Sequence, residues 1–314
     1  MGWLGVQTNF LLIIQNFREQ TGGVFDGFFL NITLFGEVFI PLFLICFFYW
    51  CVDKKIGFYI LSSYLYCFLV NTFIKTTACI YRPWILEPQI NPVAKAIPAA
   101  TGYSFPSGHT VGAASVLGGL ALSFPKNKIL FYTCLSIILL VMFSRNYLGV
   151  HTPQDVIAAF IISCIILVLN KKILECEKKY SDLIILTAAS LFCILLALYI
   201  NYKSYPIDYQ NGKLLYDPAS AKFEIVTRIG FVLGAFWGWF IEKRFIKFSP
   251  NTGSLIQKII RYVIGISILL GLVHAGGLAA ANSSHLETEL FFEYFIIAFF
   301  ITCIYPFLFS KLKM

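Results

Sequence analysis

The segment from residue 143 to 155 carries an arginine, a histidine and an aspartate between two long apolar runs. His151 and Asp155 are four residues apart, which would place them on one face of a helix. A carboxylate in that position can hold one ring nitrogen and leave the other free as a base or nucleophile. The same segment also fits an ordinary helix start, with Thr152 as N-cap, Pro153 at the first helical position and Asp155 in a capping box. It therefore indicates either a reactive histidine or a simple helix entry.

A second pair of charges, Lys75 and Arg82, precedes Pro83 at the end of another apolar run. Seven residues make two helical turns, so we expect both side chains on one helix face, with Pro83 favouring the end of the helix beside them. Such cations can anchor a span at the membrane surface. They can equally form an anion clamp, in which arginine gives a bidentate fork and lysine a point charge.

A third cluster, Ser107, Gly108 and His109, stands directly before an apolar helix rich in small residues. Backbone N–H groups at a helix start point outward and bind phosphate, helped by the helix dipole. Gly108 would allow close backbone approach, and His109 stands where a general acid would be useful. The alternative is a plain capped loop.

The three clusters together suit phosphoryl transfer to water without a metal. Three cations would neutralise the phosphoryl oxygens: Lys75, Arg82 and Arg145. Ser107 and Gly108 would donate hydrogen bonds. His151, steadied by Asp155, would attack phosphorus, and His109 would protonate the leaving oxygen. Acidic residues are scarce and the one carboxylate is taken up by histidine, so no metal and no other cofactor is expected.

The elements that must position these residues are membrane helices. The chain is 58% hydrophobic and 13% charged, with a mean hydropathy of +0.77, whereas a soluble domain is about a quarter charged. Successive runs approach the ~20 residues that cross a bilayer. We therefore predict an all-α, polytopic helical bundle. About nine spans are expected, near residues 28–51, 56–75, 109–124, 128–145, 155–170, 181–201, 224–241, 258–275 and 289–310.

Topology follows from the basic residues, which fall in alternate loops. These are Lys54 and Lys55, Lys126 and Lys128, Lys171 to Lys179, Lys243 to Lys258, and Lys311 and Lys313. Positive charge marks cytoplasmic loops, so we expect the C-terminus inside, the N-terminus outside, and the loops 76–108 and 146–154 facing away from the cytoplasm. The net charge of +8 is thereby explained without a nucleic-acid partner.

Three segments resemble the signatures of the type 2 phosphatidic acid phosphatase superfamily: residues 75–83, 106–109 and 144–155. No signature position departs from the pattern, and the resemblance covers about residues 30–170. It implies a helical core shared with vanadium haloperoxidases, a phosphohistidine intermediate at His151 and independence from metals. The segments look most like prokaryotic lipid phosphatases and sphingosine phosphate phosphatases.

The chain is thus expected to contain three parts: an amphipathic segment on the membrane surface (1–27), a phosphatase core (28–172) and four additional membrane helices (173–314). The loop 84–105 is the candidate for head-group selection, through Trp84, Lys95 and Tyr103. Glycines at 230, 234 and 238 are four apart, which suits close helix packing.

The predicted function is a membrane phosphatase that acts on a lipid phosphate monoester or pyrophosphate at an extracytoplasmic site. Its partners would be the bilayer and the lipid substrate. A soluble sugar phosphate, as in glucose-6-phosphatase, is the second hypothesis. A lipid or phosphate transporter or binding protein is the third, favoured by the four extra spans. A bacterial plasma membrane is the expected location, with the endoplasmic reticulum and a luminal site as the alternative.

Overall fold

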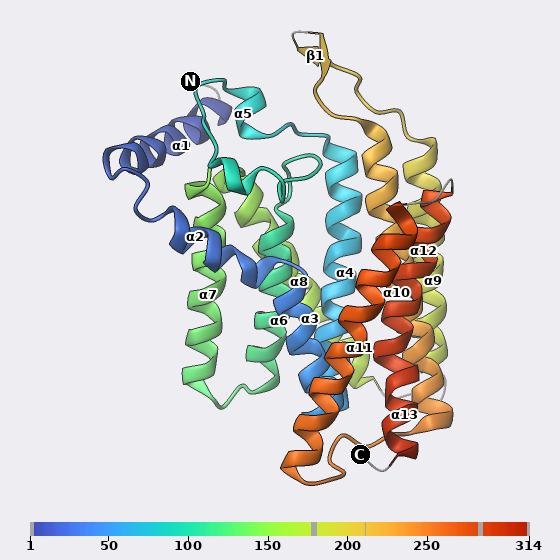
Figure 1. Ribbon diagram of the computed structural model, residues 1–314. Helices are drawn as coiled ribbons and strands as arrows, with labels where there is room; N and C mark the ends of the chain where they lie inside the picture. Colours follow the sequence, from blue (N-terminus) through green and yellow to red (C-terminus); the bar gives the residue numbers. More distant parts are fainter. Residues whose placement is uncertain (1–2, 177–180, 211, 282–284, 313–314) are drawn as a thin grey trace. The chain divides into compact units, whose positions relative to one another are not determined.

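A computed structural model describes residues 3–176, 181–210, 212–281 and 285–312. Three lysines of the expected basic loops lie outside the described residues: Lys178, Lys179 and Lys313. Helices make up nearly all of the regular structure (Figure 1). The α-helices are α1 (Trp3–Gln20), α2 (Asp26–Ile32), α3 (Phe39–Phe47), α4 (Lys54–Ala78), α5 (Pro83–Leu86), α6 (Gly108–Ser123), α7 (Lys128–Tyr147), α8 (Pro153–Glu175), α9 (Ser181–Tyr202), α10 (Pro218–Ile241), α11 (Leu255–Ala281), α12 (Leu286–Phe299) and α13 (Tyr305–Lys311).

Shorter elements connect or extend these helices. The 3-10 turns are η1 (Thr33–Gly36) and η3 (Ala94–Ala96), and the π-helical turns are η2 (Phe48–Val52), η4 (Glu242–Ile246) and η5 (Phe300–Ile304). A small antiparallel hairpin pairs β1 (Tyr209–Gln210) with β2 (Lys213–Leu214).

The expected helical membrane architecture is confirmed. Within the described residues, seven helical segments are long and apolar enough to cross a membrane. The segment from Asp26 to Val52, where the sequence predicted one continuous span, bends by 46° between η1 and α3 and makes an eighth only if its two parts form one broken span. The expected third span corresponds to α6, whose 16 residues fall short of the ~20 that cross a bilayer.

The chain forms two compact units. Unit 1 contains Met1–Leu42, Tyr66–Leu169 and Tyr205–Asp217, and unit 2 contains Phe43–Leu65, Asn170–Ser204 and Pro218–Met314. In unit 1, α6 packs against α7 and against η1. The backbones of η1 and α6 touch, because a Cβ added at Gly36 would overlap the carbonyl of His109, and one at Gly112 would overlap that of Gly36. Two glycines thereby fix the turn after α2 against the start of α6.

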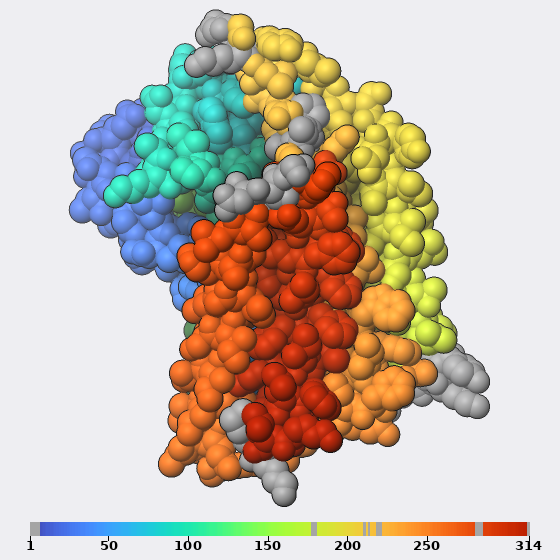
Figure 2. Space-filling model, turned by 45° about the vertical axis from the view of Figure 1, so that its right-hand side comes forward, coloured from blue at the N-terminus to red at the C-terminus, as the bar shows by residue number. Residues whose placement is uncertain are grey.

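In unit 2, α10 packs closely along α12 and its π-helical extension η5. Gly230, Gly234 and Gly238 lie against the backbone of Phe291, the backbone of Phe295 and the side chain of Thr302, so the helix-packing role predicted for these glycines is confirmed. Arg228, inside α10, forms an ion pair with Glu224 one turn earlier. Figure 2 shows α11 and α12 (orange to red) side by side on one face of this unit.

Candidate active site

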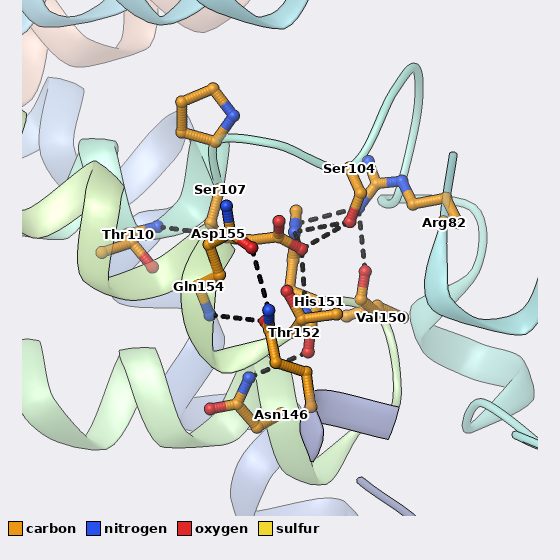
Figure 3. A network of polar contacts seen from close by, with 12 residues as sticks. Arg82, Ser104, Ser107, Thr110, Asn146, Val150, His151, Thr152, Gln154 and Asp155 are labelled. Atoms are coloured by element: carbon orange, nitrogen blue, oxygen red, sulfur yellow. Dashed lines mark hydrogen bonds and ion pairs between the residues drawn. The ribbon is translucent and has the colours of Figure 1, made fainter. Parts of the chain in front are cut away.

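The polar network of unit 1 centres on His151 and Asp155 (Figure 3). Nδ1 of His151 lies 3.2 Å from Oδ2 of Asp155. The two side chains meet, but the expected shared helix face is wrong, because His151 lies in the bend before α8 and only Asp155 is in its first turn. Oδ2 also accepts hydrogen bonds from the hydroxyl of Ser104 at 2.6 Å and from the backbone N–H of Thr152 at 2.8 Å. One carboxylate oxygen therefore serves both as helix cap and as partner of the histidine.

The hydrogen-bond pattern assigns the tautomer of His151. Its Nε2 lies 2.9 Å from Nη1 of Arg82. A guanidinium can only donate, so Nε2 must accept, and the ring proton sits on Nδ1 facing Asp155. Burial holds the pKa of His151 well below its usual range, and four charged neighbours add to this effect: Arg82, Arg145, Lys75 and His109. The imidazole is therefore neutral at pH 7, with a lone pair on Nε2.

Arg82 reaches this position from outside the helix that the sequence predicted for it. Helix α4 ends at Ala78, Cys79 adopts a positive φ of 48°, and Arg82 has an extended backbone as N-cap of α5. The expectation that it shares a helix face with Lys75 is therefore wrong. Its guanidinium also donates to three backbone carbonyls, those of Thr101, Gly102 and Val150. Arg82 thereby ties the loop 84–105 to the His151 bend.

Lys75 remains in the last turn of α4 and is 5% exposed. Its charge acts on the His151 imidazole. A lysine buried at a helix end beside His151 adds positive charge to the surroundings of this imidazole. The structure thus brings Lys75 to the site although α4 ends before Arg82.

Ser107 is the N-cap of α6, and its hydroxyl accepts a long hydrogen bond from the N–H of Thr110 at 3.4 Å. The N–H of Ser107 donates to the carbonyl of Asp155 at 3.0 Å. It is therefore not free for the phosphate contact that the sequence predicted. At Gly108, apart from its chain neighbours and the backbone of α6 itself, no described residue comes within 4 Å of the position that a Cβ would take. The first turn of α6 is open at this glycine.

Arg145 occupies the last turn of α7 and is fully buried. Its Nη1 donates to the hydroxyl of Thr33 at 2.8 Å. Nε and Nη2 have no hydrogen-bond partner among the residues that the structure describes. Buried donors are almost always paired and an unpaired charged donor is costly, so these two N–H groups could donate to an anionic partner.

The three residues expected to select a head group have different surroundings. The Trp84 ring lies 5.9 Å from the Arg82 guanidinium. Tyr103 is 1% exposed, packs against the ring of Tyr216 at 4.2 Å, and has its pKa raised by burial. Lys95 is exposed and lines a cavity of about 350 Å³, together with Arg18, Asp26 and others.

Comparison with known families places these residues in a wider group. The PAP2 superfamily matches residues 56–175, which include all three clusters. A second description, "PAP2 superfamily phosphatase, transmembrane extension", matches residues 226–314. The chain belongs to the PAP2 superfamily. The family predicted from the three signatures is therefore confirmed, and the later membrane helices also belong to a recognised part of it.

Two similar members are prokaryotic proteins. An undecaprenyl-diphosphatase from Sulfolobus acidocaldarius is 33% identical over 111 residues, which make up 35% of this chain and 50% of that protein. Phosphatidylglycerophosphatase B from Escherichia coli K12 is 43% identical over 65 residues, 20% of this chain and 26% of that protein. This chain thus spans half of the first relative and about a quarter of the second. No solved structure matches it.

Several residues of the site were not found by sequence reasoning. The hydroxyl of Ser104 donates a hydrogen bond to the carboxylate of Asp155. A serine between two aromatic residues does not by itself indicate such a contact in the sequence. Thr33 and Glu37 contact Arg145 and His109 from the segment between α2 and α3, outside the residues 56–175 that the PAP2 superfamily matches. Glu37 did carry a signal, because a lone carboxylate within an apolar membrane segment is expensive.

Proposed function

We propose that this protein is an integral membrane phosphatase that hydrolyses a phosphate monoester or pyrophosphate on a lipid. One observation carries the proposal. Arg145 is fully buried, and two of its donors, Nε and Nη2, have no partner in the described part of the chain; it lies in the unit that holds the neutral nucleophile His151. A tetrahedral phosphoryl group supplies the acceptors that this guanidinium lacks. Membership of the PAP2 superfamily and the phosphatase relatives support the same chemistry.

The mechanism proposed here begins with a neutral His151 held by Asp155. A phosphoryl oxygen takes the Arg82 donor that Nε2 of His151 accepts in the structure, which frees the lone pair. Nε2 then attacks phosphorus while the bond from phosphorus to the leaving oxygen breaks, and His109 gives that oxygen a proton. The positive charge that develops on the His151 ring is stabilised through its Nδ1–H by Asp155.

A water molecule completes the cycle. It attacks the phosphohistidine, His109 takes back a proton from this water, and the P–N bond breaks to return neutral His151 and inorganic phosphate. Three cations would hold the phosphoryl oxygens through both steps: Lys75, Arg82 and Arg145. Gly108 is the residue of the α6 start that a phosphate oxygen could approach most closely, since Ser107 uses its own N–H within the protein.

Charge along individual helices supports an extracytoplasmic site. Helix α4 begins at Lys54 and α7 at Lys128, and both end at the candidate site. Helix α8 begins at the site and carries Lys171 and Lys172 near its other end. Each of these helices therefore has lysines at one end and site residues at the other, which under the positive-inside rule directs the site away from the cytoplasm. We propose nine spans, counting the bent segment from Asp26 to Val52 and the 16-residue helix α6 beside the seven long apolar segments. The N-terminus would then lie outside and the C-terminus in the cytoplasm, most simply in a bacterial plasma membrane.

The test is phosphate release by purified protein in EDTA, with the His151→Ala variant beside each reaction. The panel contains undecaprenyl diphosphate, phosphatidylglycerophosphate, phosphatidate and glucose 6-phosphate. We expect release from at least one lipid by the wild type alone. Release from glucose 6-phosphate only would replace the lipid by a soluble sugar phosphate. No release from any substrate, or equal release by His151→Ala, would refute the phosphatase proposal and favour a binding or transport protein.

A further inference from the structure

The second histidine of the site also faces a carboxylate. Nε2 of His109 lies 3.5 Å from Oε1 of Glu37. The His109 side chain is 12% exposed and that of Glu37 is 34% exposed, so the pair lies at the edge of the buried region. His109 and Glu37 thus form a second pair of an imidazole and a carboxylate, beside the pair formed by His151 and Asp155.

The position of Glu37 is fixed by backbone contacts. It follows η1, and its N–H donates to the carbonyl of Leu34 at 3.1 Å. Gly36, directly before it, is in contact with the carbonyl of His109 and leaves no space for a Cβ. The turn that carries Glu37 is therefore held against the same residue whose imidazole the carboxylate faces. Because the backbone of Glu37 is held in place, only rotation of its side chain can move the carboxylate relative to His109.

The surroundings of His109 explain why a carboxylate is needed there. Burial and the charges of two arginines, Arg145 from α7 and Arg82 from the start of α5, lower the pKa of His109 to about 4. Glu37 opposes this shift. Two guanidinium groups disfavour a third positive charge nearby, yet a leaving-group acid must carry a proton to give away. Asp155 already has three partners, namely His151, the hydroxyl of Ser104 and the N–H of Thr152. Glu37 is the acid that the structure places beside His109.

We propose that Glu37 is the positioning residue for the leaving-group acid, an inference that rests on the phosphatase function proposed above. Oε1 of Glu37 faces Nε2 of His109 at 3.5 Å, and no described residue forms a hydrogen bond with that nitrogen. The carboxylate attracts the proton on Nε2, so Nδ1 carries the proton that moves to the leaving oxygen. The neutral ring then keeps its proton on Nε2 and presents the Nδ1 lone pair to the attacking water. One carboxylate thus fixes the tautomer through both half-reactions, with every proton accounted for.

This role gives a substrate-dependent signature. An alkoxide is a poor leaving group and needs protonation as its bond to phosphorus breaks, whereas a nitrophenolate departs readily as an anion. The experiment therefore compares n-octyl phosphate with para-nitrophenyl phosphate, which share the phosphoryl group. The ratio kcat/KM is the readout, because it reports the steps up to departure of the leaving group. Glu37→Gln removes the charge at nearly constant shape, and Glu37→Asp keeps it.

We expect Glu37→Gln to lower kcat/KM for n-octyl phosphate by about 100-fold, the low end of general-acid contributions, and that for para-nitrophenyl phosphate by less than about threefold. Glu37→Asp should recover part of the loss on the alkyl ester. Glu19→Gln is the matched control, since Glu19 is exposed on α1 of the same unit, and it should behave as wild type with both esters.

The outcomes separate this inference from the function on which it rests. An equal loss with both esters would show a structural or phosphate-binding role, and no loss would show no role, so either result overturns the inference while the phosphatase stands. A wild type that hydrolyses neither ester nor any lipid of the panel overturns the phosphatase and the inference together. The thermal midpoint of each variant in detergent establishes that the proteins compared are folded.

Discussion

Replacing Arg145 by methionine should separate activity from stability. The side chain keeps a similar length but loses the guanidinium, and with it the two unpaired donors, Nε and Nη2. A hydrogen bond to a charged group contributes about 1.5–3 kcal/mol. Two such bonds to a phosphoryl group in the transition state would be worth about 3–6 kcal/mol, so kcat/KM should fall about 10²- to 10⁴-fold.

The free energy of unfolding of Arg145→Met should stay the same or rise, although its activity falls. Among the residues that the structure describes, the Arg145 side chain forms one hydrogen bond, to Thr33, and losing it costs about 1 kcal/mol. Removing a buried charge with two unpaired donors relieves a desolvation penalty of roughly several kcal/mol. Arg145→Met is therefore expected to match or exceed the wild type in thermal midpoint, although it is nearly inactive.

The assay pairs phosphate release from a detergent-dispersed lipid with thermal unfolding, with and without orthovanadate. Vanadate should raise the midpoint of the wild type, because it binds only the folded state, and should leave Arg145→Met unchanged. Arg18→Met is the control: Arg18 donates to the carbonyls of Asn91 and Tyr147, so its loss should lower the midpoint. If Arg145→Met is destabilised like Arg18→Met and keeps its rate, the anion-binding interpretation of the unpaired donors is wrong.

Three further predictions concern Ser104, His151 and Gly36. Ser104→Ala removes one of the three hydrogen bonds to Oδ2 of Asp155 and should lower kcat about tenfold, with an effect as large as that of His151→Ala counting against a supporting role. The pKa of His151 is depressed in the folded protein, so the acid limb of kcat/KM due to this residue should lie below pH 6.5. Because the unfolded chain takes up that proton near pH 6.5, His151 should also make the fold less stable as the pH falls below that value, and a His151→Ala variant should lose this part of the pH dependence of unfolding. Gly36→Ala would overlap the carbonyl of His109 and should cost about 1–3 kcal/mol of stability together with activity, whereas Gly27→Ala, with open space around it, should not.

The sequence predicted the membrane helices and the residue types of the site because both depend on local signals. Apolar runs and basic loops are visible along the chain, and the three clusters hold recognisable combinations of donors and acceptors. Asp155 was expected to be either a helix cap or a histidine partner. In the structure the same oxygen is both, since Thr152 and His151 approach it from adjacent positions at the start of α8.

The errors arose where the backbone leaves regular geometry. Cys79 takes a left-handed conformation that no spacing rule anticipates, so Arg82 reaches His151 from a loop and not from the face of α4. The bend after η1 depends on contact between Gly36 and α6, two segments that are far apart in the chain. Periodicity reports which residues can share a face of one element, but not which loops meet in space.

The contact between η1 and α6 also determines where the chain can be cut to exchange segments with related proteins. Thr33, Gly36 and Glu37 precede residue 56, where the similarity to the PAP2 superfamily begins, yet all three touch Arg145 or His109. The segment that matches the PAP2 superfamily is therefore shorter than the set of residues that support the candidate site. A chimaera that grafts residues 56–175 onto a foreign N-terminal helix would receive every signature residue and still lack the support of one arginine and one imidazole. Exchange of parts between relatives should succeed only when the cut is made before Thr33.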